Sequence, residues 1–247
     1  MTALLLALLA GAVVGLALGG LGGGGSVLAV PALIYLAGFG PAEATTASLI
    51  IVTLTSVTAL AGHARDGNVA WRTGLLFAGA GIVPAVLAGA AAGRLPQAVL
   101  TLAFSAVAAG AALRMLRPAR AASTGEAHPA KAGAAGAGLG AVTGFLGVGG
   151  GFLAVPALVG VVRLPMRRAV GTSLLVIVIN SLAALAARAG GGLQLDWAVV
   201  APFTAAAILG AWDGKRQAKK LAGPTLQRVF AHLLLAVALL MLIDTFV

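Results

Sequence analysis

Long apolar runs, separated by short polar or basic stretches, form the pattern of the whole chain. An apolar helix of about 20 residues crosses the hydrocarbon core of a bilayer, so the longer runs are predicted to be transmembrane helices. The run 26–39 is too short to cross comfortably and is predicted to form a half-helix or a tilted helix. The apolar runs predicted to be helical are 2–18, 26–39, 45–64, 71–92, 96–114, 132–146, 151–162, 169–188, 197–212 and 224–243.

A glycine-rich motif occurs twice in this pattern, at 19–33 and again at 144–158. Aligned without a gap, both copies contain Leu-Gly-x-Gly-Gly followed by Leu-Ala-Val-Pro-Ala-Leu. At the same offset Ser48 matches Ser173, and with one inserted residue Trp71 matches Trp197. The sequence therefore predicts a duplicated unit, with repeat one at 1–117, a cytoplasmic linker at 118–131 and repeat two at 132–247. Internal symmetry of this kind is typical of secondary transporters.

Composition sets the class of protein. Hydrophobic residues make up 60% of the chain and charged residues 9%, with a mean hydropathy of +1.07. A soluble domain carries about a quarter charged residues, so most of this surface is expected to face lipid. We predict an all-α polytopic membrane protein of two repeats of about four hydrophobic segments each. The first segment of each repeat is broken by the glycine-rich stretch, as a re-entrant hairpin or as two tilted half-helices. No basic residue precedes Leu4, so the first run is interpreted as mature structure and not as a signal peptide.

The basic residues predict the orientation of the repeats. The net charge of +10 does not indicate nucleic-acid binding, because the lysines and arginines lie between apolar runs. If each glycine-rich segment crosses the membrane once, the lysines and arginines divide almost evenly between the two faces. If each returns to the face it entered from, all sixteen except Arg94 and Arg188 share one face. The positive-inside rule makes that face cytoplasmic. The repeats are then inverted, and both termini lie outside.

A glycine-rich break before a short helix favours an anion site. The first-turn N–H groups of such a helix have no partners within it and carry partial positive charge. Pro31 and Pro156 are tolerated best in a first helical turn, so the short helices are expected to begin near Ala29 and Ala154, or to be kinked there. The alternative is that the glycines serve only close helix packing.

The repeated motif, followed by Ala-x-x-(Thr/Ala)-Ser-Leu, resembles the sulfite exporter TauE/SafE family, also called the toluene sulfonate uptake permease group. The resemblance covers nearly the whole chain and implies an inner-membrane permease for small anions, chiefly sulfur oxyanions and organosulfonates. At the serine position the second copy departs, with Gly151 opposite Ser26, which favours backbone N–H donors over side chains. The family's motif positions correspond to Gly22, Gly24, Gly25, Pro31, Gly147, Gly149, Gly150 and Pro156.

Several polar residues within the apolar runs are further candidates for binding the substrate. Hydroxyl groups near the starts of two equivalent helices could bind sulfonate oxygens, cap the helices, or bond to their own backbone. These hydroxyls belong to Thr46, Ser48, Thr172 and Ser173. Asn180 lies deep in an apolar run and is expected to face a pathway or a partner helix.

The titratable residues give weaker signals. His63 and Arg188 occupy equivalent positions at helix ends, where interfacial side chains reaching out to water are expected. Asp213 is expected to pair locally. Gly20-x-Gly22-x-x-Gly25 fits a dinucleotide fingerprint only formally, because no βαβ unit surrounds it. No metal-ligand cluster is evident, the chain has no cysteine, and no cofactor is predicted.

These observations predict a secondary transporter of a small anion, working by alternating access and binding at the two glycine breaks. No ATP-binding motif is evident, so a proton or sodium gradient is the expected driving force. We expect a multi-pass protein of the bacterial inner membrane, which could assemble as a homo-oligomer. A passive anion channel and a scaffold subunit whose glycines only pack helices stay open as alternatives.

Overall fold

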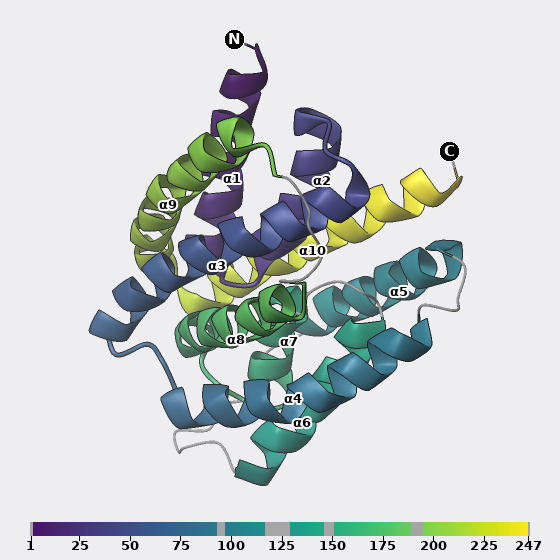
Figure 1. The fold of residues 1–247 in the computed structure, drawn as a ribbon. Helices are drawn as coiled ribbons and strands as arrows, with labels where there is room; N and C mark the ends of the chain where they lie inside the picture. Colours follow the sequence, from purple (N-terminus) through teal and green to yellow (C-terminus); the bar gives the residue numbers. More distant parts are fainter. Residues whose placement is uncertain (1, 93–96, 117–128, 146–150, 189–194, 247) are drawn as a thin grey trace.

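The computed structural model describes residues 2–92, 97–116, 129–145, 151–188 and 195–246, and within them every regular element is an α-helix (Figure 1). The helices are α1 (Thr2–Leu21), α2 (Gly24–Ala37), α3 (Pro41–Arg65), α4 (Trp71–Ala92), α5 (Gln97–Leu116), α6 (Pro129–Phe145), α7 (Gly151–Gly160), α8 (Met166–Arg188), α9 (Trp197–Lys220) and α10 (Gly223–Phe246).

The predicted all-α membrane architecture is confirmed. Among the described residues, five helices are long and apolar enough to cross a membrane: α3, α4, α8, α9 and α10. Large apolar side chains cover the outer faces of the bundle, such as Leu87, which is 67% exposed, and Leu209, which is 71% exposed. In water these surfaces would be costly, so they are the expected contact with lipid acyl chains.

Two helix boundaries differ from those expected along the basic stretches. α9 continues to Lys220 instead of ending at Trp212, so the basic run 215–220 is helical. Lys, Arg, Gln and Ala are strong helix formers, and the run lacks a proline to stop the helix. α6 begins at Pro129, inside the stretch expected to be a linker. The rest of that stretch to residue 128, like Gly147, Gly149 and Gly150, lies outside the described residues.

The two short helices begin earlier than the prolines predicted. α2 starts at Gly24 and α7 at Gly151, so Pro31 and Pro156 lie inside their helices, not in the first turn. The expected starts near Ala29 and Ala154 are therefore wrong. A proline inside a helix removes the hydrogen bond to the carbonyl four residues earlier. Each short helix thus carries a local weakness in its middle.

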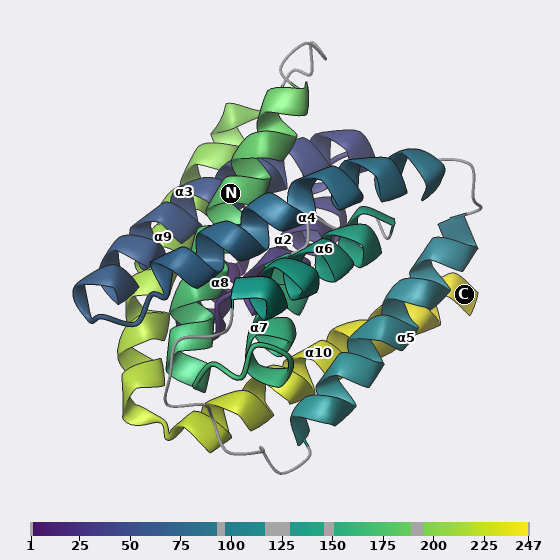
Figure 2. The same cartoon turned by 90° about the horizontal axis from the view of Figure 1, so that it is seen from below.

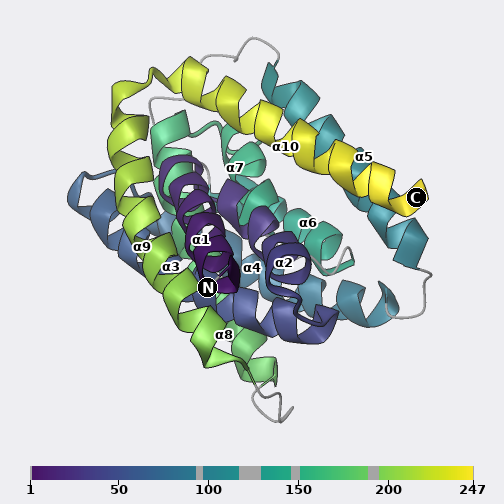
Figure 3. The same ribbon diagram turned by 90° about the horizontal axis from the view of Figure 1, so that it is seen from above.

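α2 folds back along the end of α1. The turn is made by Gly22, whose φ of +71° lies in the left-handed region that glycine adopts without strain. A Cβ on Gly25 would meet the Val14 carbonyl and the Leu18 side chain, so α2 retraces α1 at close range. Figure 3 shows α1 and α2 as neighbours. The first glycine stretch is therefore a helical hairpin.

Equivalent helices of the two predicted repeats make equivalent contacts. α1 packs extensively against α9, and its counterpart α6 packs in the same way against α4, the counterpart of α9. A Cβ on Gly11 would strike the Phe203 carbonyl, and one on the matching Gly136 would strike the matching Phe77 carbonyl. Gly11 and Gly136, which lie outside the two glycine-rich stretches, thus serve close helix packing. α3 pairs with α8, α5 with α10, and α2 with α7 (Figure 2).

This pattern is what a two-fold relation between two duplicated halves would produce, and it supports the two-repeat prediction. The boundaries at 117 and 132 and the inverted orientation across the membrane stay predictions. α7 lies in the middle of the bundle, with six of its ten residues buried (Figure 2). It packs on α5 through the rings of Phe152 and Phe104, whose centroids are 4.9 Å apart.

Candidate functional site

The two glycine breaks meet in the interior of the bundle. A Cβ on Gly23 would collide with the backbone of Gly151 and Phe152, so the turn before α2 touches the start of α7. A Cβ on Gly151 would lie 2.7 Å from the Ser26 hydroxyl. Only glycine permits this approach of two backbones. Segments about half the chain apart are therefore joined at one point.

α8 forms a third side of this contact. A Cβ on Gly22 would strike the Ser173 Oγ and would lie 3.1 Å from the Val170 carbonyl oxygen. Ser173 is fully buried. Of the residues predicted from the sequence, the structure thus brings together Gly22, Ser26, Gly151 and Ser173, and places Gly24 and Gly25 in the first turn of α2.

The hydroxyl groups of this region bond to their own backbone. Ser26 Oγ donates to the Gly23 carbonyl at 2.7 Å, Ser173 Oγ to that of Val170 at 2.8 Å, and Ser48 Oγ to that of Thr45 at 2.8 Å. The expectation that such hydroxyls satisfy their own helix is confirmed for these three serines. To bind an anion, a hydroxyl would have to rotate and donate to it instead.

No side chain caps the backbone N–H groups at the start of α2. Its N-cap, Gly23, supplies no side-chain hydrogen bond. The first turn contains Gly24 and Gly25, and no acidic residue lies there to offset the positive end of the helix. Partial positive charge therefore gathers at the point where the two breaks meet.

The remaining predicted residues lie elsewhere. Thr172 Oγ1 accepts a hydrogen bond from the Ala70 amide at 3.0 Å, so it ties α8 to the turn before α4. Thr46 is buried on α3. Asn180 is half-buried on α8, seven residues after Ser173, which is about 10 Å along the helix. The structure shows no interaction between Asn180 and the described residues of the glycine breaks.

Two buried hydroxyls were missed by the sequence reasoning. Thr55 Oγ1 and Ser56 Oγ, in the middle of α3, are buried and have no hydrogen-bond partner among the described residues. Unpaired buried hydroxyls are uncommon, because the loss of hydration is uncompensated. The repeat offset carried the signal, since Thr55 occupies the position in repeat one that Asn180 occupies in repeat two.

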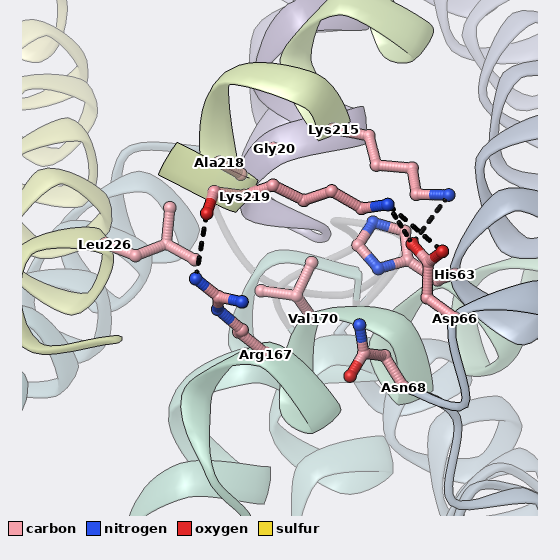
Figure 4. Close-up of a pocket in the computed structure, with 10 residues that line it drawn as sticks. All are labelled: Gly20, His63, Asp66, Asn68, Arg167, Val170, Lys215, Ala218, Lys219 and Leu226. Carbon is pink, nitrogen blue, oxygen red and sulfur yellow. Dashed lines mark hydrogen bonds and ion pairs between the residues drawn. The ribbon is translucent and has the colours of Figure 1, made fainter. Parts of the chain in front are cut away.

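A cavity of about 490 Å³ adjoins the meeting point of the breaks. Val170 belongs to both, because it lines the cavity and also contacts Gly22. Figure 4 shows the cavity between α3, α8 and α9, with the long side chains of Lys215 and Lys219 reaching across it. The residues that line it are Gly20, His63, Asp66, Asn68, Arg167, Val170, Lys215, Ala218, Lys219 and Leu226.

Ion pairs across this cavity join α9 to the turn after α3. Asp66 Oδ2 lies 2.8 Å from Lys215 Nζ and 2.9 Å from Lys219 Nζ. Hydrogen bonds from these two ammonium groups lower the pKa of Asp66 to about 2, and the bond from Lys215 has the larger effect. Lys215 also donates to the Gly62 carbonyl. On the other side Arg167 donates to the carbonyls of Lys219 and Leu221, at 3.0 Å each.

His63 does not reach out to water, as its place near a helix end had predicted. It is only 6% exposed, and its Nε2 lies 3.0 Å from the Gly19 carbonyl oxygen in the last turn of α1. The side chain of Arg188, its repeat counterpart, is outside the described part. Asp213 has a local partner, but this is Gln217, whose Nε2 donates to it at 2.6 Å, and not the nearby Lys215, which pairs with Asp66. Among the described residues no cluster of His, Asp or Glu could hold a metal ion.

An all-helical bundle of apolar spans, with two broken segments meeting in its interior, is the architecture that secondary transporters build around a binding site. The chain belongs to the family described as "Sulfite exporter TauE/SafE", which it matches over residues 7–241. The family and the apolar helices make it a multi-pass membrane transporter.

Curated relatives agree with this class. The chain is 36% identical over 238 residues to a "Probable membrane transporter protein" of Xylella fastidiosa (strain 9a5c). The aligned region covers 93% of this chain and 91% of the relative. A protein of the same name from strain Temecula1 is 35% identical over the same shares of the two chains. No solved structure matches the chain significantly.

Proposed function

We propose that the protein is a secondary transporter that moves a small anion, sulfite or an organosulfonate, across the bacterial inner membrane. The observation that carries the proposal is the contact between the two glycine breaks, where Gly23 meets Gly151 at the start of α7. Family membership supports the substrate class. The amides of Gly24 and Gly25, at the positive end of α2, would bind the anion's oxygens.

The Ser26 and Ser173 hydroxyls would add donors after rotating away from their own carbonyls. The backbones of Gly23 and Gly151 are in contact, so the described conformation has no room for a ligand between them. Binding then requires α2 and α7 to separate. In an alternating-access cycle the two halves would rock about this point, driven by a proton or sodium gradient.

A glycine substitution at the contact tests this assignment. Gly23→Ala and Gly151→Ala each place a methyl group against the backbone or the hydroxyl of the other break. In proteoliposomes we expect flux of radiolabelled sulfite to fall at least about tenfold, because α2 and α7 can no longer close into the described conformation, which the alternating-access cycle must pass through. Gly79→Ala on α4, where a Cβ meets no atom within 4 Å, is the matched control and should transport normally. Normal flux in both test variants would refute the site.

The same assay separates the two alternatives. A passive channel would equilibrate sulfite but would never concentrate it inside vesicles, whereas a coupled transporter concentrates it when a proton or sodium gradient is imposed. A scaffold subunit would show no flux in wild type. Concentration under one gradient and not the other would also identify the coupling ion.

A further inference from the structure

The cavity beside the glycine breaks carries an excess of positive charge. Arg167, Lys215 and Lys219 line it, opposed by the single carboxylate of Asp66. Positively charged walls around a recess raise the local concentration of anions. The cavity is also large compared with a single sulfur oxyanion, so its volume leaves room for a ligand and water.

Asp66 already shows that these lysines bind an oxyanion. Its two carboxylate oxygens lie 2.8 to 3.1 Å from the two ammonium groups. Lys219 keeps half of its side chain exposed, so it can turn towards another ligand. Asp66 therefore acts as a tethered competitor, whose carboxylate occupies donors that a sulfate or sulfonate group would also use.

His63 lines the same cavity, and one of its ring nitrogens is buried in the wall without a partner among the described residues. A carbonyl oxygen can only accept, so the bond to Gly19 requires the hydrogen to sit on Nε2. In the neutral imidazole Nδ1 then presents a lone pair, and it has no hydrogen-bond partner among the described residues. A lone pair repels an anion. A proton on Nδ1 would turn it into a charged donor.

The charges around His63 determine when that proton is favourable. Lys215 and Lys219 on α9 and Asp66, with which both lysines pair, line the cavity together with His63. Arg167 on α8 lines the same space. An anion in the cavity would offset these cations. Anion binding and protonation of His63 should therefore promote each other.

We propose that this cavity is a second oxyanion site, which binds its anion together with a proton on His63. It adjoins the glycine breaks through Val170 and Gly20, so an anion held there would stand next to the central site. The assignment of a sulfur oxyanion as the physiological ligand rests on the proposed function, whereas the cavity and its charges do not.

Equilibrium binding of radiolabelled sulfate to the purified full chain, in nanodiscs of zwitterionic lipid, tests the site. Asp66→Asn removes the competing carboxylate and should tighten sulfate binding about fivefold or more. Lys219→Gln should weaken it by a similar factor. Asp213→Asn and Lys220→Gln make the same charge changes on α9 outside the cavity, and should leave binding unchanged. If Asp66→Asn binds sulfate no more tightly than Asp213→Asn, the proposal is overturned.

The pH dependence tests the role of His63. Sulfate stays a dianion throughout the range in which imidazole titrates, so any dependence reports the protein. Wild-type binding should tighten by up to about tenfold for each unit of falling pH, because one proton is taken up with the anion. His63→Gln keeps a donor for the Gly19 carbonyl and should lose this slope. An unchanged slope in that variant would remove His63 from the site.

Two further arms separate the proposals. Gly23→Ala should stop flux yet keep sulfate bound in the cavity, whereas Asp66→Asn should alter sulfate binding even if the glycine variants transport normally. The first result supports both proposals, and the second retains the cavity site alone. The phosphate of an anionic lipid has similar chemistry. If sulfate does not bind, and phosphatidylglycerol retention depends on Lys219, the cavity belongs to a lipid headgroup and the proposal fails.

Discussion

At the scale of single residues, Gly22 and Ser173 show how tightly the two halves fit. Gly22 combines a left-handed φ of +71° with a position directly against the Ser173 hydroxyl. Each feature alone would restrict the position to small residues. Together they tie the turn after α1 to α8, which belongs to the other predicted repeat.

A double-mutant cycle can separate the two effects. Gly22→Ala should lower the free energy of unfolding by about 1–3 kcal/mol, from backbone strain and from the clash with Ser173. Adding Ser173→Ala removes the oxygen nearest the new methyl group, so part of the loss should be recovered and about 1 kcal/mol of strain should remain. Denaturant unfolding of the purified variants measures this coupling. Strictly additive losses would show that the two residues do not interact.

At the scale of helices, the glycines of α1 and α6 serve close packing. A Cβ on Gly15 would collide with the backbone of Ala207 on α9, and one on the equivalent Gly140 would collide with Gly81 on α4. Backbones that approach this closely gain dispersion contacts, which are the main attraction between helices in lipid. The first helix of each predicted repeat thus packs against a helix of the other repeat.

The equivalence of these two helix pairs makes a prediction of its own. Gly15→Ala and Gly140→Ala should each destabilise the protein by about 1–3 kcal/mol, because a methyl group is forced into a filled space. Gly138→Ala, two residues away on the opposite face of α6 with no atom within 4 Å of its Cβ, should be neutral or slightly stabilising. Thermal unfolding in detergent compares the three. Similar melting temperatures for Gly15→Ala and Gly138→Ala would contradict the packing.

The helices themselves were largely predictable from the sequence, because apolar runs and the glycines that interrupt them are local signals. The helical hairpin at Gly22 was anticipated as one of two alternatives, from the distribution of charge. The ion pairs of Asp66 were not predictable. Asp66 and Lys219 are 153 residues apart and have no counterparts in the other repeat, so neither spacing nor symmetry pointed to them. Burial of His63 was missed because its contact with the Gly19 carbonyl joins residues 44 apart, on α3 and α1.

At the scale of the whole molecule, α3 fixes the relation between the two faces. It is a candidate span, so its two ends are expected on opposite sides of the membrane. Gly40 precedes its start. At its other end Asp66 pairs with Lys215 and Lys219, close to the turn between α9 and α10. That second side carries most of the basic residues and is the side expected to be cytoplasmic.

Cysteine labelling can test this orientation directly, because the chain contains no cysteine of its own. Gly40→Cys should react with a membrane-impermeant maleimide applied to spheroplasts. Ala222→Cys, in the exposed turn between α9 and α10, should react only after the membrane is permeabilised. Both substitutions leave the charge distribution intact. Labelling of Ala222→Cys in intact spheroplasts would reverse the topology.

The lysines of the cavity have no counterparts at the equivalent positions of repeat one. Glycines, Gly89 and Gly93, stand at the positions of repeat one that correspond to Lys215 and Lys219. A carrier made of two like halves would present like entrances to both compartments, but the lysines of this cavity are not repeated in the other half, so the proposed oxyanion site would serve one entrance. Binding there can determine from which compartment a dilute anion loads first. It cannot alter the final distribution, which the coupled gradient alone sets, so the lysines should influence kinetics and leave the accumulation ratio unchanged.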